Sequence, residues 1–267
     1  MRIARFAVAG QDPTYGIVEL AVDGGDHPDT VSALTGDPLA GSPVNYTGER
    51  HELAEVRLLA PVIPRSKVVA VGKNYADHAA EMGGEVPATP LLFFKPNTSV
   101  IGPGETIVRP QGCQDLHFEG ELAVVIGRIC KQVPVDRVRE VIFGYTAAND
   151  VTARDWQASD GQWARAKGAD TFLPLGPWIN THWSIEEAES LTIETRLGDE
   201  VRQSGSTAQL VRGIAELVSY ISSFTTLLPG DVILTGTPAG VGSMQPGDTA
   251  HVEIDGLGVL SNPVADA

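Results

Sequence analysis

The sequence predicts an α+β fold in which strands outnumber helices, with a small N-terminal domain ahead of a larger one. Most apolar segments are short and end in turn residues, as in RIARFAV and KVVAVG. The 29 glycines and 18 prolines among 267 residues favour many short elements joined by tight turns. Only residues 206–227 have the length and apolar spacing of a long helix.

Residues 1–62 are predicted to form the small N-terminal β-rich domain. Residues 2–8 and 15–22 read as short strands separated by Gly, Pro and Asp turns. Pro61 and Pro64 mark the boundary, because proline continues neither a strand ladder nor a helix.

Residues 63–267 are predicted to form the second domain. Residues 67–72 (KVVAVG) have the composition of a buried strand, and the segment 74–82 that follows has helical spacing with Asp77 as a candidate cap. Residues 134–144 indicate a short helix.

The C-terminal third is predicted to hold a hairpin, a long helix and two more strands. Residues 191–205 alternate around a central Gly-Asp, as hairpins do. Ser206 can cap the helix of residues 206–227, and Pro-Gly-Asp turns at Pro229 and Pro246 precede the strands VILTGT and TAHVEID. The helix has one apolar stripe, made by Leu210, Val211, Ile214, Leu217, Val218 and Ile221.

The composition excludes several classes of partner. A net charge of −15 argues against a nucleic acid or an anionic membrane, because both need a basic surface. Cys113 and Cys130 form no CxxC pair, which indicates a reducing compartment. The apolar segment within MRIARFAVAG is too short for a signal peptide. No segment is apolar enough to span a membrane. We expect a soluble cytoplasmic protein.

Two neighbouring glutamates precede a strand apolar enough to be buried, in HFEGELAVVIG. On one strand Glu119 and Glu121 point to the same side, together with His117 if the strand begins that early. Two carboxylates beside a core repel each other unless one takes up a proton or a cation lies between them. The pair is therefore either a solvated strand face or part of a divalent-metal site, and His117 is interpreted as a supporting or surface residue rather than a ligand.

A second polar set follows at residues 149–157 (NDVTARDWQ). Asp150 directly follows the mostly apolar segment VIFGYTAAN and adds a third carboxylate. Arg154 and Gln157 are neighbours in space if the turn there is helical. Lys167 comes one segment later; by composition it is a surface lysine, and its alternative is a place in the site. These charges suit a cation together with an organic anion.

Six segments in order resemble the fumarylacetoacetate hydrolase family: GKNYADHAAEM, FFKP, HFEGELAVVIG, GYTAANDVTARDWQ, KGADTFLPLGP and PGDVILTGTPAGVG. The resemblance covers roughly residues 65–262. It implies a rolled mixed β-sandwich with few helices and a homodimer. Because the N-terminal part is short, the chain is more similar to the short prokaryotic-type members, which include acylpyruvate hydrolases, oxaloacetate decarboxylases and 2-hydroxyhepta-2,4-diene-1,7-dioate isomerases.

The resemblance also implies the roles of nine residues. It makes Glu119, Glu121 and Asp150 the ligands of Mg²⁺ or Mn²⁺. It makes His78 and Glu81 a general-base pair on a segment that Asn74 and Gly83-Gly84 flank as candidate hinges. Lys167 would stabilise an oxyanion, and the residues that would hold the substrate are Arg154, Gln157 and Thr237.

These residues support three hypotheses about function. The first is a metal-dependent hydrolase or lyase that cleaves the C3–C4 bond of a 2,4-dioxo acid or of oxaloacetate through a metal-stabilised enolate. The second is an isomerase or decarboxylase of 2-hydroxyhepta-2,4-diene-1,7-dioate in aromatic catabolism. The third is an oxo-acid-binding protein without turnover, which the presence of both His78 and Glu81 disfavours. In each, the partner is a small anionic 2-oxo acid.

Overall fold

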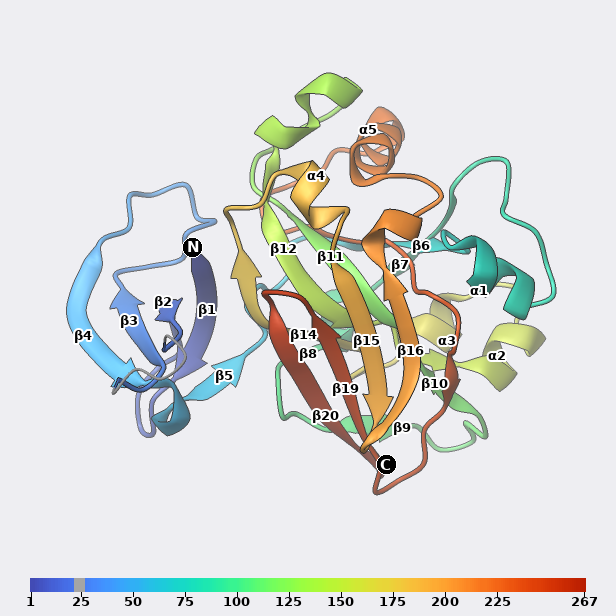
Figure 1. The fold of residues 1–267 in the computed structure, drawn as a ribbon, viewed down its shortest axis with the longest axis horizontal. Helices are drawn as coiled ribbons and strands as arrows, with labels where there is room; N and C mark the ends of the chain where they lie inside the picture. Colours follow the sequence, from blue (N-terminus) through green and yellow to red (C-terminus); the bar gives the residue numbers. More distant parts are fainter. Residues whose placement is uncertain (22–26) are drawn as a thin grey trace.

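The computed structural model describes residues 1–21 and 27–267, and strands dominate it (Figure 1). The predicted β-rich α+β class is confirmed. The helices are α1 (Ala76–Glu81), α2 (Arg154–Ser159), α3 (Ala164–Gly168), α4 (Ile185–Ala188) and α5 (Ile214–Phe224). The strands are β1 (Arg2–Ala7), β2 (Thr14–Glu19), β3 (Thr30–Leu34), β4 (Tyr46–Glu52), β5 (Arg57–Leu59), β6 (Val68–Gly72), β7 (Leu91–Lys95), β8 (Val100–Ile101), β9 (Ile107–Arg109), β10 (Leu116–Phe118), β11 (Gly120–Ile126), β12 (Ile142–Asn149), β13 (Thr152–Ala153), β14 (Leu173–Asn180), β15 (Thr192–Leu197), β16 (Glu200–Ser206), β17 (Val232–Leu234), β18 (Gly242–Ser243), β19 (Thr249–Ile254) and β20 (Gly258–Asp266).

The largest sheet has the order β4-β3-β2-β1-β14-β12-β11-β17-β6-β7, with β5 paired to β1 and β8 to β14. Strand β11 is antiparallel to both β12 and β17, and β17 is parallel to β6. The start of β11 therefore lies beside the ends of β12 and β17, and the end of β6 lies one strand further along. Residues that follow these three strands are brought to one edge of the sheet.

A second sheet, β16-β15-β19-β20-β9, covers one face of the first and lies in front of β11 and β12 in Figure 1. Leu122 of β11 packs with Ile193 and Val252 of this second sheet in the main core. Ala123 points the other way and joins a second cluster with Val68. Both faces of β11 are buried, which explains why its sequence is apolar without alternation. These layers form the expected mixed β-sandwich.

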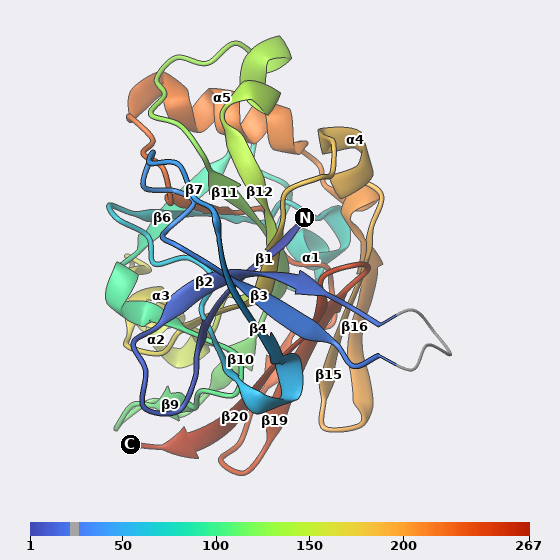
Figure 2. The ribbon, with the colours of Figure 1, turned by 90° about the vertical axis from the view of Figure 1, so that its left-hand side faces the viewer.

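The N-terminal strands β1–β5 lie at one side of the molecule, on the left of Figure 1 and facing the viewer in Figure 2. They join the large sheet through β1 and β14, with Arg2 opposite Asn180. The predicted strand of residues 15–22 is seen as β2, although Val22 lies outside the described residues. The division of the chain at residue 62 stays a prediction.

Helix α5 starts later than predicted. Ser206 caps only a 3₁₀ turn at Thr207–Gln209, and Gly213 is the N-cap of α5. The residues between the 3₁₀ turn and Gly213 are not helical, because the N–H groups of Val211 and Arg212 donate to Asn74. Consequently Val211 is exposed, and the buried stripe contains Ile214, Leu217, Val218 and Ile221.

One other local prediction was wrong, and another was confirmed with a different helix type and length. Asp77 lies within the first turn of α1 and forms no cap, since Tyr75 holds the N-cap position. The short helix expected at residues 134–144 is a 3₁₀ helix over Val135–Glu140, and β12 begins immediately afterwards at Ile142.

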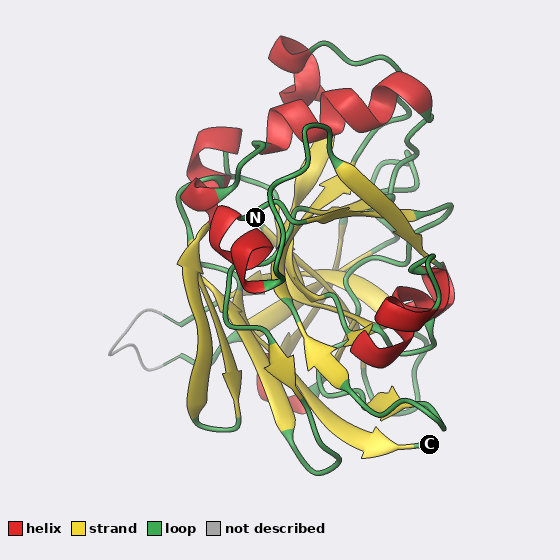
Figure 3. Cartoon of the chain, turned by 90° about the vertical axis from the view of Figure 1, so that its right-hand side faces the viewer, coloured by secondary structure: helices red, strands yellow, loops and turns green. Residues whose placement is uncertain are grey.

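The helices lie at the rims of the strand layers (Figure 3). Helices α1, α2 and α3 are on the side away from the N-terminal strands (Figure 1). Among the residues that the structure describes, no helix has the length and apolar character needed to cross a membrane.

Candidate metal and substrate site

Three acidic side chains converge at the edge where β11 begins and β12 ends. Glu119 and Glu121 lie at the start of β11, and Asp150 directly follows β12. The backbone N–H of Asp150 donates to the carbonyl of Glu119 at 2.8 Å. All three are buried, and one carboxylate oxygen from each lies within 4.8 Å of the others. The antiparallel pairing of the two strands thus brings together the three carboxylates that the sequence singled out.

His117 stands apart from this acidic cluster. The strand is interrupted at Glu119, with β10 ending at Phe118 and β11 beginning at Gly120. The ring of His117 pairs instead with Asp115, with 3.0 Å between Nε2 and Oδ1. Burial, together with the nearby charge of Arg154, lowers the pKa of His117. Its contact with Asp115 agrees with the interpretation that it is not a ligand.

Buried cations surround two of the three acids. The ammonium of Lys167 donates to Glu119 Oε2 at 2.7 Å and to Asp150 Oδ2 at 2.6 Å. Lys95 Nζ donates to Asp150 Oδ1 at 2.5 Å, and the guanidinium of Arg154 pairs with Glu119. Lys167 is only 2% exposed, which excludes the alternative of a surface lysine.

Glu121 differs from its two neighbours, because within the described chain it forms no ion pair. Its carboxylate accepts one hydrogen bond, from the backbone N–H of Gly236 at 2.7 Å. Burial and the charges of Asp150 and Glu119 raise the pKa of Glu121 well above its ordinary value. Burial acts in the same direction on Glu119, but the charges of Lys167 and Arg154 outweigh it and hold the pKa of Glu119 well below its ordinary value.

The donor set fits a divalent cation. Three buried carboxylates with oxygens this close are the ligands that Mg²⁺ and Mn²⁺ prefer. The uncompensated charge of Glu121 is the specific observation that a cation at this point would satisfy. The residues present therefore could hold such an ion.

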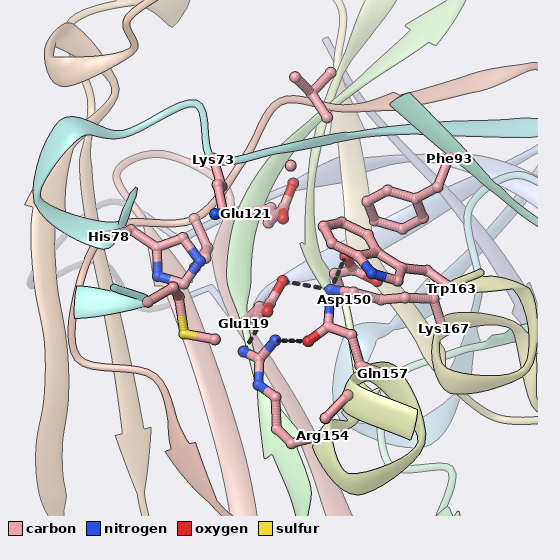
Figure 4. A pocket seen from close by; sticks show the side chains of 15 residues that line it. Lys73, His78, Phe93, Glu119, Glu121, Asp150, Arg154, Gln157, Trp163 and Lys167 are labelled. Atoms are coloured by element: carbon pink, nitrogen blue, oxygen red, sulfur yellow. Dashed lines mark hydrogen bonds and ion pairs between the residues drawn. The ribbon is translucent and has the colours of Figure 1, made fainter. Parts of the chain in front are cut away.

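The acidic cluster forms the floor of a cavity of about 320 Å³ (Figure 4). Figure 4 shows His78 on one side of the cluster and Arg154 with Gln157 on another. An aromatic wall is formed by Phe93 and Trp163, whose rings meet edge to face at 5.4 Å. The walls are completed by Val71, Gly72, Lys73, Met82, Ala158, Lys167 and Thr237.

His78 and Glu81 form the predicted pair on α1. His78 is 5% exposed, and its Nδ1 lies 3.2 Å from Glu81 Oε2. The same carboxylate accepts the N–H of Gly240 at 3.0 and 3.2 Å. Glu81 therefore links α1 to the glycine-rich loop after β17 and holds the ring of His78 at the cavity.

Asn74 anchors the start of this segment. Its buried amide donates to the carbonyls of Arg212 and Thr235 at 3.0 and 2.8 Å, and its Oδ1 accepts the N–H of Arg212. A side chain held in three directions is a fixed point. The hypothesis that Asn74 acts as a hinge is therefore not supported by its contacts.

Arg154 and Gln157 are neighbours on α2, as their spacing predicts. Arg154 Nη1 donates to Gln157 Oε1 at 2.9 Å. The Nε of Arg154 is buried and, in the described part of the chain, has no hydrogen-bond partner. Arg154 and Gln157 both line the cavity, so the pair can meet an acceptor that enters it.

Thr237 lines the cavity, but its hydroxyl is already engaged. The hydroxyl donates to the carbonyl of Gly120 at 2.7 Å and accepts from Gln203 Nε2 at 2.7 Å. Thr237 thus fixes the start of β11, whereas the resemblance implied that this residue holds the substrate. A contribution of this residue to substrate binding stays a prediction, and it would have to come from its backbone.

Sequence reasoning missed Lys95, Phe93 and Trp163. The motif FFKP did carry a signal for Lys95: a lysine at the end of an apolar strand, ahead of a proline, needs a buried acid nearby. No pattern indicates Trp163, which lies in a polar segment and reaches the cavity only through the packing of α3 near β7.

Replacing Lys95 with Met should destabilise the metal-free protein by about 3 kcal/mol, because breaking a buried ion pair leaves an uncompensated charge. Lys95 is fully buried and contacts Asp150 and the carbonyl of Val151. Urea unfolding would measure the loss, with Lys131→Met on the surface as control. Equal unfolding free energies for Lys95→Met and the control would show that Lys95 is dispensable for stability.

Two family models match the chain. The model described as Fumarylacetoacetate (FAA) hydrolase C-terminal matches residues 67–265, which include every site residue above. A second model, described as Rv2993c-like, N-terminal, matches residues 1–61.

Three known proteins show what the chain is similar to. The structure of 5-carboxymethyl-2-hydroxymuconate delta-isomerase from Mycobacterium smegmatis is 46% identical, with a TM-score of 0.89 and all of both chains covered. Human oxaloacetate tautomerase FAHD2A is 43% identical over 220 residues, which are 79% of this chain and 70% of the relative. Maleylpyruvate hydrolase from Sphingobium sp. SYK-6, solved with manganese and pyruvate, is 29% identical with a TM-score of 0.79 and both chains fully covered.

Proposed function

The chain belongs to the fumarylacetoacetate hydrolase family, and we propose that it is a divalent-metal-dependent enzyme that moves a proton at C3 of a 2-oxo dicarboxylic acid. The products are the enol form of the acid or an isomer with a shifted double bond. Two relatives with over 40% identity carry names of this chemistry, an oxaloacetate tautomerase and a hydroxymuconate isomerase. Their named substrates share a carboxylate next to a keto or enol carbon and a second carboxylate further along.

The observation that carries the proposal is that the His78–Glu81 pair and the acidic cluster line the same cavity. When Nδ1–H donates to Glu81, the other ring nitrogen of His78 has a free lone pair. A base of this kind is needed for removing a proton from C3. A protein that only binds 2-oxo acids has no use for it.

The proposed reaction balances within the site. His78 takes the proton from C3, and the electrons of the broken C–H bond form the C2–C3 double bond while the keto oxygen gains the negative charge. Return of the proton to that oxygen gives the enol, and its delivery further along a conjugated chain shifts a double bond. Lys167 uses two of its three N–H donors on Glu119 and Asp150, which leaves one for an oxyanion.

Glu119, Glu121 and Asp150 would hold the ion. Bound Mg²⁺ or Mn²⁺ would polarise the keto group and stabilise negative charge on its oxygen. Arg154 and Gln157, which lie side by side in the cavity wall, would bind the carboxylate next to the keto carbon.

The charges in the site favour a substrate with two negative groups. Lys95, Lys167 and Arg154 equal the three acids in number, and Lys73 balances Glu81 beside the cavity. A divalent cation therefore adds a charge of about +2 to a nearly neutral site. A dianion restores neutrality, whereas a monoanion leaves one positive charge uncompensated.

Cleavage of the C3–C4 bond, the first hypothesis from the sequence, is the second candidate. The maleylpyruvate hydrolase with pyruvate supports it, and the same His78–Glu81 pair could activate a water molecule for this reaction.

The two candidates are separated by one set of assays with purified protein and Mg²⁺. The expected result is rapid loss of the enol absorbance of oxaloacetate, abolished by EDTA, with little pyruvate released from oxaloacetate, acetylpyruvate or fumarylpyruvate. Metal-dependent pyruvate release as the dominant reaction would establish C3–C4 cleavage instead. Tight oxalate binding in a calorimeter, without turnover of any of these compounds, would establish a binding protein.

A further inference from the structure

Lys73 lines the cavity but belongs to none of the ion pairs described above. We propose that its ammonium binds the distal carboxylate of the substrate, and that it thereby selects 2-oxo dicarboxylic acids over 2-oxo monocarboxylic acids. The inference rests on the proposed function and adds a specificity-determining residue to it.

The backbone holds Lys73 in an unusual conformation at the site edge. Lys73 directly follows β6, and β17 separates the end of β6 from the start of β11 at the same edge of the sheet. Its φ is 56°, in the left-handed region that residues other than glycine seldom adopt. This turn places a partly buried lysine on the cavity wall, where Figure 4 shows it near His78.

The ammonium of Lys73 lacks a partner within residues 1–21 and 27–267, where it forms neither an ion pair nor a hydrogen bond. The other cations of the site differ: Lys95, Lys167 and Arg154 are each bound to an acid of the cluster. A charged group that is partly withdrawn from water and unpaired gains most from an anionic ligand. Lys73 is therefore the cation that remains available for the substrate.

The location of Lys73 suits the far end of a dicarboxylic acid. Figure 4 shows Lys73 and Arg154 on opposite sides of Glu119. A substrate whose keto acid end is bound by Arg154 and Gln157 would extend across the cluster toward Lys73. Each of the two substrate carboxylates would then bind one positively charged side chain.

Gly84 gives a second way to test the position of the ammonium. An added Cβ at Gly84 would lie 2.7 Å from Lys73 Nζ, and the next atoms near it are 3.9 Å or more away. Gly84 does not have a positive φ, unlike Gly83. Gly84→Ala is therefore expected to move the ammonium while keeping its charge and the backbone.

The test compares two ligands of equal length, 2-oxoglutarate and 2-oxopentanoate, which differ in the distal carboxylate. Calorimetric titration of the Mg²⁺-loaded protein gives both dissociation constants for wild type, Lys73→Met, Lys73→Arg and Gly84→Ala. We expect wild type to prefer 2-oxoglutarate, and Lys73→Met to lose about 10- to 100-fold in affinity for 2-oxoglutarate alone. Lys73→Arg should retain most of the preference, and Gly84→Ala should lose part of it.

An equal loss for both ligands in Lys73→Met, or no loss for either, would overturn the role of Lys73. That outcome leaves the proposed function intact if oxaloacetate tautomerisation continues in the same preparations. Conversely, a wild-type preference that depends on Lys73 in a protein without turnover would refute the proposed function and support the inference. Absence of any preference in wild type would refute the inference directly.

Discussion

Glu121→Gln should abolish metal-dependent turnover and at the same time stabilise the metal-free protein. Glu121 is the buried acid without a counter-cation in the described chain, so the neutral amide removes its repulsion with Glu119 and Asp150. The same change replaces one of the three carboxylate ligands with a neutral amide, which holds Mg²⁺ less tightly. We expect turnover to fall by about 1,000-fold.

Thermal unfolding with and without Mg²⁺ measures both effects of Glu121→Gln. In the variant the metal-free melting temperature should rise and the increase on adding Mg²⁺ should disappear. Glu49→Gln, on the exposed strand β4, is the control and should change neither. A variant that still gains the wild-type stabilisation from Mg²⁺ would show that Glu121 is not a ligand.

The pH dependence of the unfolding free energy tests the burial of the Glu121 carboxyl group independently of the metal. The folded-state pKa of Glu121 lies above its ordinary value of 4.5, so the folded protein binds this proton more tightly than the unfolded chain. Metal-free wild type should therefore become more stable as the pH falls from neutral toward 4.5, and Glu121→Gln should lack this gain. Glu119, whose pKa is lowered, loses its contribution only below that range.

His78→Ala should lower the rate of proton transfer by about 100-fold, the usual contribution of a positioned general base. Because His78 forms no hydrogen bond or ion pair with the three acids in the described chain, the Mg²⁺ affinity should stay close to the wild-type value. Glu81→Gln keeps an oxygen for the histidine Nδ1–H but removes the charge that supports the imidazolium. The rate of proton transfer should therefore fall less in Glu81→Gln than in His78→Ala.

Tautomerisation and hydrolysis differ in how they respond to His78→Ala. Proton transfer needs no activated water. The decrease in tautomerisation rate in His78→Ala should therefore be smaller than the decrease in Glu121→Gln. Comparable losses in both variants would favour the hydrolytic candidate. His182→Ala, at an exposed position, is the control for removing a histidine.

The parts of the fold that sequence patterns predict are those set by short-range chemistry. The apolar run of β11 indicates a strand buried on both faces, and the hairpin at residues 191–205 follows from its alternation and central Gly-Asp. The late start of α5 was not predictable in this way. It depends on hydrogen bonds from Val211 and Arg212 to Asn74, which lies far away in the sequence.

In the site, too, local sequence patterns predict some contacts, and others depend on tertiary packing. Residue types and strand ends indicate the acidic cluster, and helical spacing indicates both the His78–Glu81 and the Arg154–Gln157 contacts. The engagement of the Thr237 hydroxyl with Gly120 and Gln203 depends on the packing of three strands. Such contacts require the tertiary structure, because no local pattern encodes them.

A crystal structure with Mn²⁺ and oxalate is the most direct test that three converging acids hold a metal for a 2-oxo acid. The expected result is an anomalous scattering peak in contact with Glu119, Glu121 and Asp150, with oxalate bound to the same ion inside the cavity. A peak elsewhere, or a cluster that excludes manganese while oxalate binds without it, would contradict the proposed chemistry.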